Sequence, residues 1–162
     1  MSPPSAPTVW LRPATLADCD WVFELANDPA TRAASFHSEL IPHDVHVRWY
    51  ENTLAGSARK LFVAETTGTA LGIIRFDFLA SEPGVAEIGI AIAAEMRGRG
   101  LSRGLLAAAT ETARTLGIAR IVARIKPENT PSIRAFQAAG YRQSEEVLFT
   151  GAPAHHYELE VG

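Results

Sequence analysis

The order of apolar and polar residues along the chain predicts a single α/β domain. Apolar residues recur at helical spacing in some stretches, and in others they alternate with polar residues or run together. The predicted strands cover residues 9–12, 61–65, 71–77, 85–93, 119–125, 141–149 and 155–160, and the predicted helices cover 16–26, 43–54, 102–116 and 131–139. Residues 30–41 match neither period and are predicted to be irregular. No repeat or linker interrupts this order.

Capping residues support these boundaries. Thr15 with Asp18 is typical of a capping box at the first helix. Asn129, followed by a proline two residues later, predicts the start of the last helix, and Gly140 its end. The strand at 85–93 is almost wholly apolar after its one acidic residue, so we expect a central strand that is buried on both faces.

Composition narrows the class of protein. The chain has 162 residues, of which 47% are hydrophobic and 20% charged, with a net charge of −3, so general nucleic-acid binding is not expected. The single cysteine, Cys19, excludes an intramolecular disulfide and is interpreted as a packed thiol. No apolar run reaches the roughly 18 residues that span a membrane. We expect residues 1–8 to form a flexible tail on a cytoplasmic protein.

The most informative segment for chemistry is the glycine-rich turn at 97–103, Arg-Gly-Arg-Gly-Leu-Ser-Arg. It follows the apolar strand and opens the helix at 102–116, which directs backbone N–H groups and the positive end of the helix dipole at one place. A phosphate or pyrophosphate suits that place. The turn does not follow the first strand, as in a dinucleotide fold, and it lacks the Gly-Lys-Ser/Thr of a nucleotide triphosphatase loop.

Two motifs in these segments resemble those of the GNAT superfamily of acyl-CoA N-acyltransferases. The first, Gln/Arg-x-x-Gly-x-Gly/Ala, is present as Arg97, Gly100 and Ser102. At the last position serine replaces the usual glycine or alanine. The second, Asn-x-x-Ala/Ser-x-x-x-Tyr/Phe-x-x-x-Gly-Phe/Tyr, is present as Asn129, Ser132, Phe136, Gly140 and Tyr141. The resemblance extends over about 9–160, and we assign residues 9–162 to one N-acetyltransferase domain.

The resemblance implies a fold and a co-substrate. The expected fold is a mixed, mostly antiparallel twisted sheet whose central strands splay apart, flanked by about four helices. Acetyl-CoA would lie with its pantetheine arm in the gap and its pyrophosphate on the turn, and no metal is required. The implied contacts are Ile90, Ala91, Ile92, Arg97, Gly98, Arg99, Gly100, Leu101, Ser102, Arg103, Asn129, Ser132 and Phe136. Lys126 and Arg134 are either contacts of the 3′-phosphate or surface charges.

Catalysis requires an amine to lose a proton and a thiolate to leave. Glu87, the one carboxylate at the head of the apolar strand, is the candidate base, with a salt bridge or a water relay as alternatives. Many relatives have tyrosine at the position of Phe136 as the general acid, so Tyr141, water or unassisted departure would replace it here. An N–H between Ile90 and Ile92 would stabilise the oxyanion.

The acceptor site in this family forms from the segment after the first helix and from the central strands. Here that predicts Arg32, Phe36, His37, His46, Trp49 and Phe76 as acceptor-binding residues, with burial in the core as the alternative for each aromatic. The pattern resembles enzymes that acetylate amino sugars of nucleotide-linked sugars and, less closely, ribosomal-protein N-termini. A CoA-binding regulatory module is the non-enzymatic alternative. We expect a small-molecule amine as partner and neither nucleic acid nor membrane; a homodimer is left open.

Overall fold

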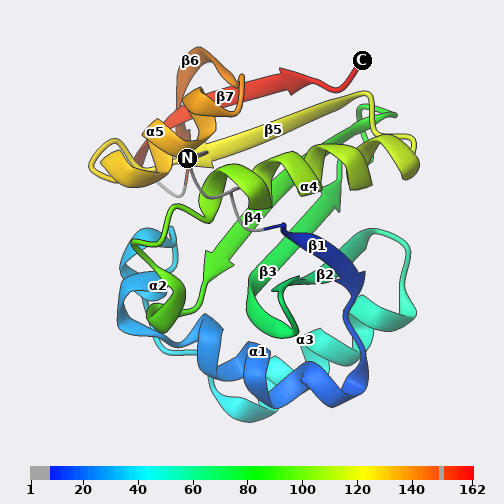
Figure 1. Cartoon of the computed structure of the whole chain (residues 1–162). Helices are drawn as coiled ribbons and strands as arrows, with labels where there is room; N and C mark the ends of the chain where they lie inside the picture. Colours follow the sequence, from blue (N-terminus) through cyan, green and yellow to red (C-terminus); the bar gives the residue numbers. More distant parts are fainter. Residues whose placement is uncertain (1–7, 150–151) are drawn as a thin grey trace, which may run out of the picture.

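The computed structural model describes residues 8–149 and 152–162. The predicted flexible tail therefore lies, except for Thr8, outside the described residues. The elements are β1 (Trp10–Pro13), the 3-10 turn η1 (Leu16–Asp18), α1 (Cys19–Ala26), α2 (Pro29–Ala34), α3 (His43–Ala55), β2 (Arg59–Thr66), β3 (Thr69–Phe78), β4 (Val85–Ile92), the 3-10 turn η2 (Ala94–Met96), α4 (Ser102–Thr115), β5 (Arg120–Ile125), α5 (Thr130–Ala138), β6 (Arg142–Phe149) and β7 (Ala152–Glu160) (Figure 1).

The strands form one seven-stranded sheet in the order β1-β2-β3-β4-β5-β7-β6. Every neighbouring pair is antiparallel except β4 and β5, which run parallel because α4 carries the chain from the end of β4 back to the start of β5. The mixed, mostly antiparallel sheet expected from the sequence is confirmed, as are the hairpin between β2 and β3 and the terminal pair β6 and β7.

Two apolar clusters hold helices against the two faces of the sheet. On the first face, α4 and α5 pack on alternate residues of β2 to β5, and the buried set includes Ile74, Phe76, Ile88, Leu105, Leu106, Ile121 and Phe136. On the second face, α1 and α3 pack over β2 and β3 through Val22, Tyr50, Leu61 and Val63. Figure 1 shows α1 and α3 together on one side of the molecule, away from α5.

The predicted helix caps are present. The Asp18 carboxylate accepts a hydrogen bond from the Thr15 amide at 2.9 Å and is held by both terminal nitrogens of Arg12, each at 2.8 Å. The Asn129 side chain accepts from the Ser132 amide at 3.4 Å and caps α5. These contacts fix the first and last helices at the residues that the sequence marks for them.

The prediction of an irregular segment at 30–41 is wrong over its first part, which forms α2. The Asp28 carboxylate caps this helix by accepting from the amides of Ala30 and Thr31, at 3.1 and 3.2 Å. Pro29 occupies the first helical position, where its missing N–H costs nothing. The dipeptide Asp28-Pro29 is therefore a helix start that the apolar periodicity alone does not reveal.

The central strands separate as the sequence predicts. β4 and β5 pair only at Val85–Glu87 with Arg120–Val122, although β4 continues to Ile92 and β5 to Ile125. Beyond Glu87, β4 remains paired with β3, and β5 remains paired with β7. The expectation that β4 is buried on both faces is wrong beyond Ile88, where its residues are half-buried. This opening between two parallel strands defines the candidate site.

Candidate functional site

The turn between η2 and α4 presents backbone donors without acceptors. Gly98 and Gly100 have φ of +74° and +70°, a left-handed conformation that L side chains rarely adopt. Among the described residues, none accepts a hydrogen bond from the N–H groups of residues 98–103. Four N-terminal amides of any α-helix lack partners within it. Here the two preceding glycines extend that set of donors into the turn.

The turn has the features of an anion-binding site. A Cβ added at either glycine would have no heavy atom within 4 Å, so the space over the turn is open to a ligand. The Leu101 side chain is buried in the core and anchors the turn from beneath. Arg99, in the middle of the turn, and Arg103, in the first turn of α4, are exposed. Open space, backbone donors and flanking cations together are the requirements of an anion site.

Arg97 is placed differently from its neighbours. Its terminal nitrogen donates to the Asp28 carboxylate at 2.7 Å and to the Thr31 hydroxyl at 3.3 Å. This arginine, an expected contact of the pyrophosphate, therefore ties the turn to the start of α2. The guanidinium also lowers the pKa of the Asp28 carboxyl.

A second tie fixes the other end of α2. The Lys126 ammonium, just beyond the end of β5, donates to the carbonyl of Ala33 at 2.8 Å. The helix is thus attached to both sides of the opening, to the turn after β4 and to the end of β5. Figure 1 shows α2 close to the carboxyl end of β4. It follows that α2 borders the opening at its wide end, where the carboxyl ends of both strands lie.

The remaining implied contacts of coenzyme A surround the same opening. Ile90, Ala91 and Ile92 lie on the part of β4 that has no partner on its β5 side. Asn129 and Ser132 lie at the start of α5, which follows β5. The structure thus brings the two sequence motifs to the two sides of one gap, and their binding roles remain predictions.

Glu87 lies at the narrow end of the opening, on the second face of the sheet. It is the last residue of β4 paired with β5, and its carboxylate accepts from the Arg124 guanidinium, at 3.1 Å from Nε and by a second, shorter contact. The predicted salt bridge is present. The Glu87 side chain is 18% exposed, so the carboxylate is still open to solvent on this face. Its role as a base remains a prediction.

Phe136 and Tyr141 are interior residues. Phe136 is 3% exposed, and its ring meets that of Tyr141 edge to face at 4.8 Å between centroids. Burial raises the pKa of the Tyr141 hydroxyl, which has no hydrogen-bond partner among the described residues. A thiol ordinarily has a pKa near 8.5, below that of a tyrosine hydroxyl. Proton transfer from Tyr141 to the departing thiolate would therefore be unfavourable. Tyr141 is therefore a poor proton donor, and Phe136 contributes to packing.

Of the expected acceptor-binding residues, Phe76 and His46 lie in the interior, and Trp49 is partly buried. Phe76 is fully buried against Phe62. His46 is 2% exposed, and its Nε2 lies 3.0 Å from the carbonyl of Cys19. Trp49 packs on the cluster of α1 and α3 and under the Arg59 guanidinium, which lies 5.5 Å from the ring centroid. For Phe76 and His46 this burial favours the alternative of a core role, and an acceptor contact by Trp49 remains a prediction.

The other expected acceptor residues lie in the segment between α1 and α3. Arg32 donates to the backbone carbonyls of Ala26 at 2.7 Å and His37 at 2.8 Å, so it holds the segment's own fold. Phe36 is half-buried and His37 is exposed. Of the six expected acceptor residues, Phe36, His37 and the partly buried Trp49 thus have rings that are at least partly accessible.

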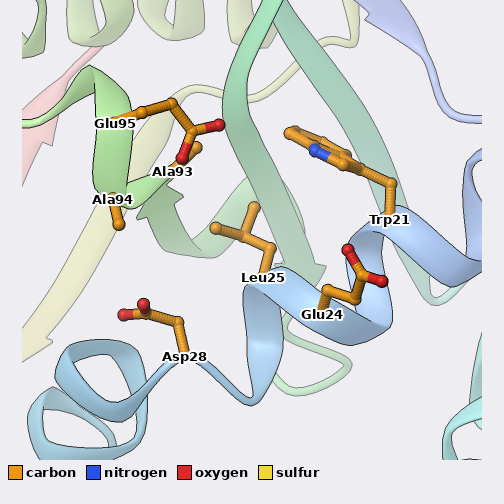
Figure 2. A pocket seen from close by; sticks show the side chains of 7 residues that line it. All are labelled: Trp21, Glu24, Leu25, Asp28, Ala93, Ala94 and Glu95. Carbon is orange, nitrogen blue, oxygen red and sulfur yellow. The ribbon is translucent and has the colours of Figure 1, made fainter.

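Two hollows lie beside this region, and the sequence predicted neither. One, of about 140 Å³, lies between α1 and η2 and is lined by Trp21, Glu24, Leu25, Asp28, Ala93, Ala94 and Glu95 (Figure 2). The other, of about 360 Å³, lies on the second face and is lined by Leu79, Glu82, Val85, Arg120, Val122, Ser144, Glu145, His156 and Glu158. Val85 and Val122 flank Glu87 in the sheet, so the larger hollow adjoins the candidate base.

Within the described residues, no cluster of three or more His, Cys, Asp or Glu side chains is arranged to hold a metal ion. The described helices include none that is long and apolar enough to cross a membrane.

Comparison with known proteins identifies the class that this fold and site define. The family model of the acetyltransferase (GNAT) domain matches residues 8–142, and the chain belongs to this family. An aminoglycoside N(6′)-acetyltransferase type 1 of Salmonella typhimurium is 31% identical over 115 residues, covering 67% of this chain and 79% of the relative. The L-amino acid N-acyltransferase MnaT of Escherichia coli is 29% identical over 136 residues, covering 81% of this chain and 78% of the relative.

The solved structures agree in fold. The spermidine N-acetyltransferase of Vibrio cholerae, solved with CoA and spermine, superposes with a TM-score of 0.82 at 19% identity, covering 94% of this chain and 95% of that one. The protein is accordingly an acetyl-CoA-dependent N-acetyltransferase that acts on amines. Acetyl-CoA supplies the activated acetyl thioester.

Proposed function

We propose that this chain transfers the acetyl group of acetyl-CoA to the primary amine of a small acceptor that binds on the second face of the sheet. The observation that carries the proposal is the run of N–H groups at 98–103 without partners among the described residues, placed at the mouth of two separating strands. Those amides hold the diphosphate, and the free edges of β4 and β5 hold the pantetheine arm.

The acceptor approaches from the second face because α4 and α5 fill the first. Glu87 faces the acceptor there and takes the amine's proton, directly or through water. An N–H of the residues from Ile90 to Ile92 stabilises the developing oxyanion. The thiolate leaves without a protein acid, which its low basicity permits, and water then protonates it.

The acceptor is drawn from small amines of the kinds that the relatives' names carry: aminoglycosides, spermidine and amino acids. None of those names supports the nucleotide-linked amino sugar that the sequence suggested. It is kept as one candidate acceptor in the screen described below. A peptide N-terminus remains an alternative acceptor.

The test is thiol release from acetyl-CoA across a panel of aminoglycosides, polyamines, amino acids, nucleotide-linked amino sugars and short peptides. Release with a small amine is the expected result. Tight CoA binding without release for any amine would favour the regulatory module, and release with peptides alone would favour the protein acetyltransferase.

A matched pair of variants tests Glu87. Glu87→Gln removes the carboxylate, and we expect kcat/KM at pH 7 to fall by roughly 100-fold or more, with partial recovery at higher pH as the free amine becomes abundant. Arg124→Gln breaks the same ion pair but keeps the carboxylate, so it should retain most activity. Equal losses in the two variants would mean that the ion pair matters and the base does not.

A further inference from the structure

One guanidinium on the second face lies directly over the narrow end of the opening. Arg75 of β3 is the register partner of Gly89 of β4. A Cβ added at Gly89 would lie 2.7 Å from one terminal nitrogen of Arg75 and 3.4 Å from the other. The absence of a side chain at Gly89 therefore leaves the space in which the Arg75 guanidinium lies across the strand.

This position is next to the reaction centre that the fold defines. Gly89 is two residues beyond Glu87, the last paired residue, so it is the first position on the second face after the strands separate. Residues two apart on a strand share a face, and so do register partners on neighbouring strands. Arg75, Glu87 and Gly89 consequently share the face from which the acceptor approaches.

Beside Gly89 the arginines outnumber the carboxylates, whereas farther along this face Arg120 lies between Glu82 and Glu158. Asp77 accepts hydrogen bonds from Arg59 and from Arg75 Nε, the latter at 3.0 Å, and Glu87 accepts from Arg124. Three arginines thus face two carboxylates. Arg75 uses only its Nε in these bonds; within the described part of the chain neither terminal nitrogen has a hydrogen-bond partner. The side chain is 37% exposed, so a ligand can reach it.

We propose that Arg75 binds an acidic group of the acceptor, and that the preferred acceptors are amines that carry a carboxylate close to the amine, as α-amino acids do. This inference rests on the proposed function and names the substrate class of the same site. The planar guanidinium pairs with a carboxylate through two parallel hydrogen bonds. In an α-amino acid a single carbon separates amine from carboxylate, so a carboxylate on Arg75 holds the amine beside Gly89 and Glu87. The side chain of the bound amino acid would then extend toward the hollow that Val85 and Val122 help to line.

The same charges disfavour a polycation at this position. An aminoglycoside or polyamine needs carboxylates that are free to pair with ammonium groups. Both carboxylates here already face arginines, and the Arg75 guanidinium would repel an ammonium ion. Carboxylates line both hollows, Glu24 and Glu95 in one and Glu82, Glu145 and Glu158 in the other, but Gly89 lines neither of them.

The experiment compares the common L-amino acids with their carboxamides, with kanamycin and spermidine as cationic acceptors. Each carboxamide keeps the amine and the side chain but lacks the negative charge. We expect kcat/KM to favour at least one acid over its amide by roughly 10- to 100-fold, as for the loss of a charge-assisted hydrogen-bonded pair. Calorimetric titration of acid and amide into the CoA-saturated protein provides a second readout that does not depend on turnover.

Variants separate Arg75 from the ion-pair network. Arg75→Gln should raise KM for the acid with little change in kcat and abolish the preference for acid over amide. Arg75→Lys keeps the charge without the planar fork and should show an intermediate preference. Arg59→Gln is the matched control, because it also removes a partner of Asp77 but leaves the guanidinium over Gly89.

The outcomes distinguish this inference from the proposed function. If only kanamycin, spermidine or the amides are turned over, the acetyltransferase proposal stands and the acidic acceptor is wrong. If no amine releases thiol, the proposed function fails. The titrations then test by themselves whether Arg75 binds the carboxylate of the acid. Equal binding of acid and amide, or an Arg59→Gln effect as large as that of Arg75→Gln, overturns the assignment.

Discussion

Replacing Gly100 by alanine tests the anion site with little other disturbance. The added Cβ meets no heavy atom within 4 Å, so the one penalty is the left-handed backbone at φ +70°. That conformation costs an L residue about 1–2 kcal/mol. Gly117→Ala is a matched control, because Gly117 has φ +76° and equally open surroundings at the opposite end of α4. Each variant should lower the melting temperature by several degrees, since about 1 kcal/mol corresponds to 2–4 °C at this size.

The two variants should differ in their affinity for coenzyme A. In Gly100→Ala the turn can relieve its strain only by rotating the adjacent peptide groups, which turns amides of the 98–103 run away from a bound diphosphate. Loss of one hydrogen bond to a charged group costs about 1.5–3 kcal/mol. We therefore expect Gly100→Ala to weaken CoA binding by roughly 10- to 150-fold, and Gly117→Ala to leave it unchanged.

Isothermal titration of CoA, with differential scanning calorimetry of the same samples, measures both quantities. Similar losses of stability with a selective loss of CoA affinity at Gly100 are the expected result. Unchanged affinity in Gly100→Ala, or an equal loss in Gly117→Ala, would refute the assignment of these amides to the diphosphate.

Three further results are expected. Phe136→Ala, which empties a buried site, should lower the unfolding free energy by about 3–5 kcal/mol in urea denaturation, and a loss below about 1 kcal/mol would contradict its placement in the core. Burial lowers the pKa of His46, so below about pH 6.5 the unfolded chain binds the extra proton and stability should fall as the pH falls; His46→Gln should flatten that slope between pH 7 and 5. Asp28→Ala removes the cap of α2 and its tie to Arg97, so amide exchange measured by mass spectrometry should accelerate over α2 but not over α4.

Local signals were enough to predict most elements of the fold. The capping box at Thr15, the Asn129 cap and the apolar periods of α3 and α4 depend on neighbours in sequence, and each is present in the structure. The short helix α2 was missed because six residues hold too few apolar positions to show a period, although Asp28-Pro29 marks its start. The partial exposure of β4 beyond Ile88 was also missed, because its apolar run alone indicates burial on both faces, whereas the separation from β5 was implied by the family resemblance.

The site could be predicted where it depends on the backbone. A glycine turn between a strand and a helix fixes the position of amides by itself, so residues 98–103 lie as expected. Side-chain roles depend on partners distant in sequence. Arg97 pairs with Asp28, His46 contacts Cys19, and Arg75 lies over Gly89, and none of these pairings is written in a local pattern.

The segment between α1 and α3 is closed at its base by a single side chain. The Asn27 amide donates to the carbonyl of Ile41 at 2.9 Å and accepts from its N–H at 2.8 Å, as an opposing strand residue would. Because lengthening a loop that is already closed adds little entropic cost, insertions between the end of α2 and Ile41 should be tolerated without disturbing the sheet. Exchange of residues 34–40 alone would keep Asp28 and Thr31, which hold Arg97, and Ala33, which accepts from Lys126, so this part of the segment can vary while α2 still braces the turn.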